Sequence, residues 1–335
     1  MSRISNQWRV AGLIFLLAVA TGCPRGGSKT ARDGSSDQFT IAVIPKSTGG
    51  EFWETVEQGA REAAADLGVE MKWEGPLAET ELAEQNKIIE NMVNLGVDGM
   101  ALAPLNNRTM QKSVENVVQA RIPVVIFDSA VDGDAHISFV ATDNEAGGAI
   151  AAKYLIEQLG DRKRLFLLRY IQGTASTEQR AQGYLETAQE AGFDVLADPY
   201  TEDATVAGAI KTASNVLEGF IKDGALQLDG MFATNLYSTI GLLEALKDLR
   251  KSGVKVDVVF VGFDTNPKLV EDLQAGNIQA LVSQRPQKMG ALAVQTLVQH
   301  LRGEKVEPRI DTGVELVTRE RLENEPEIRK LVGLK

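Results

Sequence analysis

Short apolar runs that alternate with helix-like segments are the feature that most restricts the fold of this chain. Ten such runs follow one another from Phe39 onward, and most are continuously apolar. Continuous apolar runs are typical of parallel strands that are covered on both faces. Strand–helix–strand repeats of this kind predict a doubly wound parallel α/β fold. The runs are 39–45, 69–75, 99–104, 123–129, 137–143, 164–171, 193–200, 230–235, 256–264 and 278–284.

The segments between the runs have the spacing of amphipathic helices. In 53–67 the apolar side chains recur every three or four residues and form one stripe. Gly68 follows this segment directly, and Gly192 and Gly253 follow two later segments. Because glycine readily adopts the left-handed conformation that commonly ends a helix, these segments are predicted to be the connecting helices.

An internal repeat indicates two similar lobes. Residues 58–70 (QGAREAAADLGVE) recur in pattern as residues 182–194 (QGYLETAQEAGFD). Each copy is predicted to contain the first helix of a unit, the glycine that ends it and the start of the next strand. Convergence on common helix residues is the alternative, but the shared order of positions favours duplication. A length of 335 residues accommodates about two domains.

The N-terminal residues have the composition of an export signal. Arg3 and Arg9 surround the start of a segment whose apolar stretch, 10–20, is too short to span a membrane as an ordinary helix. Residues 20–23 (ATGC) resemble the lipobox of bacterial lipoproteins, which implies that Cys23 is lipidated. The resemblance implies a lipoprotein signal peptide over 1–22 and a flexible tether over 23–38. The alternative is a soluble secreted protein whose signal contains a single unmodified cysteine.

Charge and motif content exclude several classes of function. A formal net charge of −11 argues against a nucleic-acid partner, which needs clustered Lys and Arg. The sequence contains no G-x-G-x-x-G, G-x-x-x-x-G-K-[ST], G-x-S-x-G or H-E-x-x-H motif. Its single cysteine is the one assigned to lipidation, and His136 and His300 are far apart in sequence. We therefore expect no cofactor, no metal site and no catalytic residues.

Two of the apolar runs end on a carboxylate. Asp128 ends the run 123–129 before one serine, and Asp264 ends the run 256–264. In doubly wound folds the ligand binds at the carboxyl ends of the strands. An unpaired carboxylate at such a position is costly, so we expect both to meet a ligand. The alternative for each is a local helix N-cap.

Several short motifs, in order along the chain, resemble one protein family. The chain is similar to type I periplasmic solute-binding proteins of the ribose- and galactose-binding group, which are the ligand receptors of ABC importers. The resemblance runs from about Phe39 to the C-terminus. The motifs are STGGEFW (47–53), GVDGMALAP (96–104), IPVVIFD (122–128), VATDN (140–144), TEQRAQGY (177–184), ATN (233–235), VGFD (261–264) and SQRP (283–286).

The resemblance implies two doubly wound parallel-sheet lobes joined by a three-crossing hinge. The N-terminal lobe is predicted to comprise 39–142 plus 285–312, and the C-terminal lobe 143–284 plus 313–335. The crossings would then lie near Asp143, near Gln284 and near 311–314.

The resemblance also implies a set of ligand contacts. The aromatic residues would cover a sugar ring, the two aspartates would accept from neighbouring hydroxyls, and the arginine and amides would donate to oxygens. The implied residues are Phe52, Trp53, Asp128, Arg180, Asn235, Asp264 and Gln284.

Four other residues of this set also have structural alternatives. Phe52 and Trp53 could be core residues of the following helix. Arg180 could be a surface residue that pairs with a neighbouring glutamate. Gln284 could brace the hinge instead of contacting ligand.

The chain also departs from the ribose-type pattern. Gly50 replaces a polar Asn, Ser129 replaces an Arg, Leu236 replaces an acid, and Ala204 lies near the place of a second aromatic residue. The polar clamp has therefore lost groups, for which Glu51 and Tyr237 are candidate replacements.

The sequence predicts capture of a small solute, a sugar, by hinge closure in the cell envelope. The protein would be exported, anchored to a membrane through Cys23 and monomeric, and its partner would be an ABC permease. A sensory receptor that signals to a chemoreceptor or sensor kinase is the main alternative, and a secreted enzyme is a lesser one. A transcription regulator of this fold is disfavoured, because its DNA-reading helices would precede the first strand, where this chain has a signal and a linker.

Overall fold

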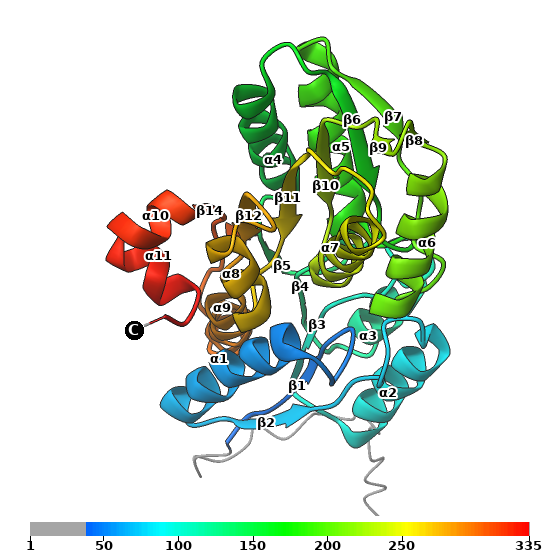
Figure 1. The fold of residues 1–335 in the computed structure, drawn as a ribbon. Coiled ribbons are helices and arrows are strands. Elements are labelled where there is room, and N and C mark those ends of the chain that lie inside the picture. The colour runs from blue at the N-terminus through cyan, green and yellow to red at the C-terminus, as the bar shows by residue number, and fades with distance from the viewer. Residues whose placement is uncertain (1–37, 335) are drawn as a thin grey trace, which may run out of the picture. The chain divides into compact units, whose positions relative to one another are not determined.

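The computed structural model describes residues 38–334, shown in Figure 1. These residues form eleven helices and fourteen strands. The predicted signal peptide 1–22, Cys23 and all but the last residue of the tether lie outside the described residues. Within 38–334, no helix has the length and apolar content that crossing a membrane would require.

The strands form two six-stranded sheets, and every predicted run contains one strand. The first sheet has the order β13-β5-β4-β3-β1-β2 and the second β14-β12-β11-β10-β6-β7. The first comprises β1 (Thr40–Ile44), β2 (Glu70–Trp73), β3 (Gly99–Leu102), β4 (Val124–Phe127), β5 (Ser138–Ala141) and β13 (Arg309–Asp311). The second comprises β6 (Arg164–Leu168), β7 (Asp194–Ala197), β10 (Gly230–Ala233), β11 (Val259–Phe263), β12 (Ala280–Ser283) and β14 (Glu315–Thr318).

The prediction of two doubly wound parallel-sheet lobes is confirmed, with one local exception. The pairs in both sheets are parallel except β12 with β14, which is antiparallel. The edge strands β13 and β14 and the short hairpin β8 (Ile221–Lys222)–β9 (Ala225–Leu226) were not expected from the sequence. β13 (RID) and β14 (ELVT) mix polar with apolar residues, and β8 and β9 have only two residues each, so none of them forms a continuous apolar run.

Helices cover both faces of each sheet (Figure 1). In the first sheet, α1 and α9 cover one face and α2 and α3 cover the other. In the second sheet, α4 and α5 cover one face, and α6, α7 and α8 cover the other. Helices α10 and α11 pack against the second sheet. The helices are α1 (Glu51–Leu67), α2 (Leu82–Leu95), α3 (Gln111–Gln119), α4 (Asn144–Leu159), α5 (Ala175–Glu190), α6 (Val206–Glu218), α7 (Leu236–Lys251), α8 (Pro267–Gln274), α9 (Pro286–Leu301), α10 (Arg319–Asn324) and α11 (Pro326–Leu331).

The repeated Gln-Gly segments occupy equivalent places in the two lobes. Gly59 lies on α1 where it crosses α9, and a Cβ atom there would overlap the carbonyl oxygen of Gln287. Gly183 lies on α5 where it crosses α4, and a Cβ atom there would overlap the carbonyl oxygen of Glu145. The repeat therefore encodes the same close helix crossing twice.

The chain passes between the lobes at three points, after β5, after β12 and after β13. The three segments are joined by buried side chains. The Thr142 hydroxyl donates to Gln284 Oε1 at 2.8 Å, and the hydroxyls of Thr142 and Thr312 lie 3.2 Å apart. The predicted three-crossing hinge is thus a hydrogen-bonded unit.

Candidate functional site

One cavity lies between the two lobes and brings all the predicted ligand residues together. Those residues are Phe52, Trp53, Asp128, Arg180, Asn235, Asp264 and Gln284. Residues that were not predicted also line it, among them Lys46, Glu79, Tyr170, Ser176 and Thr177.

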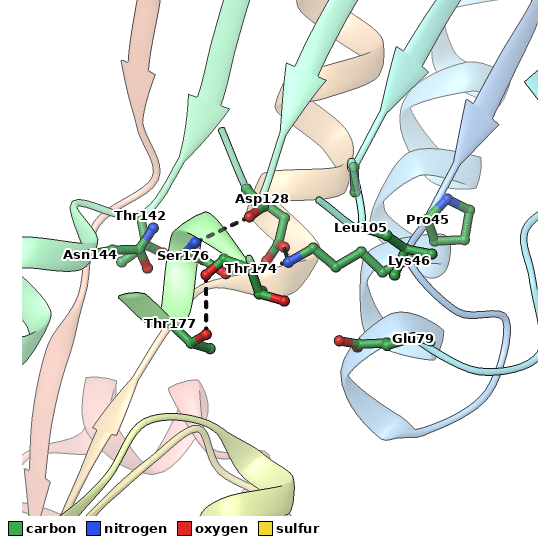
Figure 2. A network of polar contacts seen from close by, with 12 residues as sticks. Pro45, Lys46, Glu79, Leu105, Asp128, Thr142, Asn144, Thr174, Ser176 and Thr177 are labelled. Carbon is green, nitrogen blue, oxygen red and sulfur yellow. Dashed lines mark hydrogen bonds and ion pairs between the residues drawn. The ribbon is translucent and has the colours of Figure 1, made fainter. Parts of the chain in front are cut away.

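The N-terminal lobe contributes a buried ion pair. Asp128 directly follows β4 with a left-handed backbone (φ 62°), and Lys46 stands two residues beyond β1. Figure 2 shows the Lys46 side chain extending to Asp128, and their Nζ and Oδ2 atoms lie 2.6 Å apart. Both side chains are at most 5% exposed. Lys46 was not among the predicted ligand residues, although it directly follows the predicted run 39–45 and so lies at the carboxyl end of a strand.

The aromatic pair serves both the cavity and the core. Phe52 and Trp53 meet edge to face, with ring centroids 5.0 Å apart. Trp53 also packs against Phe127 within the core of the N-terminal lobe. Its Nε1 donates to Glu79 Oε1 at 2.9 Å. The core and ligand interpretations of Trp53 are therefore compatible, because one side chain meets both environments.

Arg180 is buried under the cavity and does not pair on the surface. Its Nε donates to Asn144 Oδ1 at 2.9 Å and its Nη1 donates to the carbonyl oxygen of Thr234 at 3.0 Å. The guanidinium lies over the Phe263 ring at 3.8 Å. Burial lowers the pKa of Arg180, and the cavity carboxylates, Asp264 foremost, oppose this shift. The surface-pairing alternative with Glu178 or Glu186 is wrong.

Asp264 and Asn235 meet at the start of α7. Asp264 follows β11 with a left-handed backbone (φ 71°), and its Oδ2 accepts from the Leu236 N–H at 3.0 Å. Asn235 caps the same helix, because its Oδ1 accepts from Ser238 N at 3.0 Å. The amide nitrogen of Asn235 is then the group best placed to donate to a ligand. Burial raises the pKa of Asp264, and the charge of Arg180 opposes that shift.

Gln284 connects the cavity to the hinge. Its Nε2 donates to Asp264 Oδ1 at 2.7 Å, and its Oε1 accepts from Thr142. The hinge alternative for Gln284 therefore describes its bonds, while the side chain also lines the cavity.

The lobes touch beside the cavity. Lys46 Nζ donates to Ser176 Oγ at 3.3 Å, and Ser176 N donates to Ser129 Oγ at 3.1 Å. Farther out, Asn107 N donates to the carbonyl oxygen of Gly173 at 3.2 Å. The structure therefore has the lobes closed on each other.

Of the two candidate replacements, only one lines the cavity. The Tyr237 ring stacks on Tyr170, with centroids 6.0 Å apart, whereas Glu51 is exposed at the start of α1. Tyr170 was missed because it lies within the run 164–171 and resembles a core residue. Within 38–334, no group of three His, Cys, Asp or Glu side chains is arranged to hold a metal ion.

Two α/β lobes with a polar cavity between them define a two-lobed solute-binding protein. The chain belongs to the family of periplasmic binding protein domains, whose model matches residues 41–305.

Solved structures of similar chains include two bacterial solute-binding proteins. One, from Agrobacterium vitis with bound D-fucose, is 34% identical, with a TM-score of 0.80 over 88% of this chain and 99% of that one. Another, from Agrobacterium radiobacter in complex with D-arabinose, is 31% identical, with a TM-score of 0.81 over 89% and 100%. The ribose import binding protein of Haemophilus influenzae is 29% identical over 85% of this chain and 93% of its own length.

Proposed function

We propose that this protein captures one small sugar in the cavity between its lobes and presents it to an ABC permease. The observation that carries the proposal is the lining of the cavity, where carboxylates and cations stand beside an aromatic pair. Carboxylates accept from vicinal hydroxyls, a guanidinium donates to sugar oxygens, and an aromatic ring covers the apolar face of a sugar. The D-fucose and D-arabinose bound by similar proteins support this ligand class.

The closed cavity favours a monosaccharide over a longer saccharide. Contacts between the lobes enclose this space, so a longer saccharide would have to separate Lys46 from Ser176.

Binding energy would drive closure of the hinge. A sugar that contacts Asp128 in one lobe and Arg180 in the other makes both sets of contacts only when the lobes meet, so it favours the closed state. Gln284 bonds to Asp264 of the cavity and to Thr142 of the hinge, so it links the ligand site to the segment about which the lobes would close. No bond in the sugar is made or broken in this mechanism.

The proposal includes export and a lipid anchor. Membership of the periplasmic binding family supports export, and the ATGC sequence at 20–23 supports lipidation of Cys23. The mature protein would be a monomer, held by the tether 23–38, with lobes of 39–142 plus 285–312 and 143–284 plus 313–335. Cys23→Ser is expected to release the protein from membrane pellets or block its processing, and unchanged fractionation with normal maturation would remove the anchor from the proposal.

Calorimetry with D-ribose, D-allose, D-arabinose, D-fucose, D-galactose and D-glucose tests the function. We expect at least one sugar to bind at a single site and be recovered unchanged. Arg180→Gln should abolish the heat signal, while Arg319→Gln, an exposed arginine on α10, should leave it unaltered. Absence of binding to every sugar, or conversion of a sugar into a product, would overturn the proposal.

A further inference from the structure

The loop between β2 and α2 carries a carboxylate, Glu79, into the cavity. Backbone and side-chain bonds hold this loop against the segment after β1. Thr48 N donates to the carbonyl oxygen of Pro76 at 2.9 Å, and Ser47 Oγ donates to that of Leu77 at 2.9 Å. The loop is therefore fixed before a ligand arrives, which places Glu79 without an ordering cost.

The Glu79 carboxyl is held by neutral groups. Trp53 Nε1 donates to it at 2.9 Å, and the Tyr170 hydroxyl of the other lobe interacts with it. Lys46 is nearby, but Figure 2 shows that its ammonium is directed to Asp128, with which it forms the 2.6 Å pair. Burial raises the pKa of Glu79, and the charge of Lys46 opposes this shift. A carboxyl group in this setting has acceptor capacity that its protein partners leave unused.

Resting on the proposed function, we propose that Glu79 is a specificity-determining residue that accepts a hydrogen bond from one particular hydroxyl of the sugar. Asp128 and Asp264 follow the ends of β4 and β11, whereas Glu79 lies on the loop after β2 and accepts from Trp53, so we assign it a different hydroxyl from theirs.

The physical basis is the cost of an unmatched acceptor. When the lobes close over a sugar that lacks this hydroxyl, the Glu79 carboxylate loses water and gains no donor in return. A site built to hydrogen-bond a substrate hydroxyl rejects the analogue that lacks it much more strongly than an apolar pocket rejects a change of shape. Lys46 and Glu79 then supply polar contacts in place of the Asn and Arg that ribose-type members carry at positions 50 and 129.

A cycle that combines protein variants with deoxy sugars tests the inference. For each sugar of the calorimetric panel that binds, dissociation constants are measured for the parent and all its monodeoxy derivatives. The measurement is made on the wild type, on Glu79→Gln and on Glu74→Gln. Gln keeps an oxygen for Trp53 Nε1, and Glu74 is an exposed acid of the same loop that does not line the cavity.

We expect one deoxy position to cost the wild type and Glu74→Gln about 10- to 150-fold in affinity, the range for a hydrogen bond to a charged group. In Glu79→Gln the same position should cost less than about fivefold, while the other positions keep their wild-type costs. Equal costs at every position in all three proteins would overturn this inference and leave sugar capture intact. Failure of the wild type to bind any sugar would overturn both.

Discussion

The two lobes place different chemistry at equivalent points of one scaffold. Lys46 stands two residues beyond β1 in the N-terminal lobe, and Tyr170 stands two residues beyond β6 in the C-terminal lobe. Directly after the third strand of each sheet order stands Asp128 or Asp264, and both have a left-handed backbone. The first lobe pairs its charges directly, at 2.6 Å. In the second, among the contacts of the described residues, Arg180 and Asp264 form no direct ion pair and neutral groups hold each of them.

From this difference we infer that the charges of the N-terminal lobe act mainly on stability and those of the C-terminal lobe mainly on ligand affinity. In a direct buried ion pair the two charges largely compensate each other. We therefore expect removal of one partner of the Lys46–Asp128 pair to affect the free energy of unfolding most. Charges that have only neutral partners can interact more strongly with a ligand. We therefore expect substitutions of Asp264 and Arg180 to affect ligand affinity most. Variants that separate stability from affinity test the distinction.

Lys46→Met should give the largest loss of stability. It leaves the Asp128 carboxylate buried without its cation, which costs about 3–5 kcal/mol in comparable pairs. Urea unfolding of the ligand-free protein measures this loss. Adding Asp128→Asn removes the orphaned charge and should recover at least about 1 kcal/mol, since Asn tolerates the left-handed backbone.

The matching cycle in the other lobe uses Arg180→Met with Asp264→Asn. Because these groups do not pair directly, the second substitution should recover less than it does in the N-terminal lobe. Equal recovery of stability in the two lobes would contradict the proposed difference in how their charges are paired.

Asp264→Asn should have the next largest effect, on affinity. The change keeps an oxygen for Leu236 N and suits the left-handed backbone, but it removes the charge. We expect sugar binding measured by calorimetry to weaken about 10- to 150-fold, which corresponds to 1.5–3 kcal/mol for a hydrogen bond to a charged group. Asp128→Asn should weaken it less, and the reverse order would contradict the comparison.

The sequence predicted the scaffold because its signals are local. Most strands lie in runs rich in apolar residues, and the helix after β1 and the helix after β6 each carry the Gln-Gly pattern whose glycine the helix crossing requires. The edge strands β13 and β14 were missed because they are set by pairing with β5 and β12, which no local pattern records.

The cavity was predictable to the extent that its residues end strands or match family motifs. Lys46 satisfied the strand-end criterion and was overlooked. Glu79 did not, because it lies within a long loop that also contains Glu74 and Glu81, and it is distinguished by its bond with Trp53 and its place in the cavity lining. The double use of Gln284, by cavity and hinge, depends on three segments that are distant in sequence.

Gly59→Ala and Gly183→Ala test whether the lobes share one helix crossing. Each adds a methyl group where a neighbouring backbone leaves no space, so each should cost about 1–3 kcal/mol in urea unfolding, and by similar amounts. Gly219→Ala is the control, because Gly219 has helical angles and space for a Cβ atom, and it should change stability by less than about 0.5 kcal/mol. A large loss at only one crossing would show that the helix pairs are not equivalent.

The pH dependence of stability should show the smallest effect and compares one acid from each lobe. Burial raises the pKa of Glu79 and of Asp264, so the folded protein holds these protons to higher pH than the unfolded chain does. Their contribution to stability is therefore full below the ordinary carboxyl pKa and is lost as pH rises through the raised value. Relative to wild type, Glu79→Gln and Asp264→Asn should each become more stable between pH 4 and pH 8, as measured by urea unfolding without ligand. A difference that stays flat for Glu79→Gln alone would mean that water reaches the acid of the N-terminal lobe when no sugar is bound, and that burial of this carboxyl waits for closure.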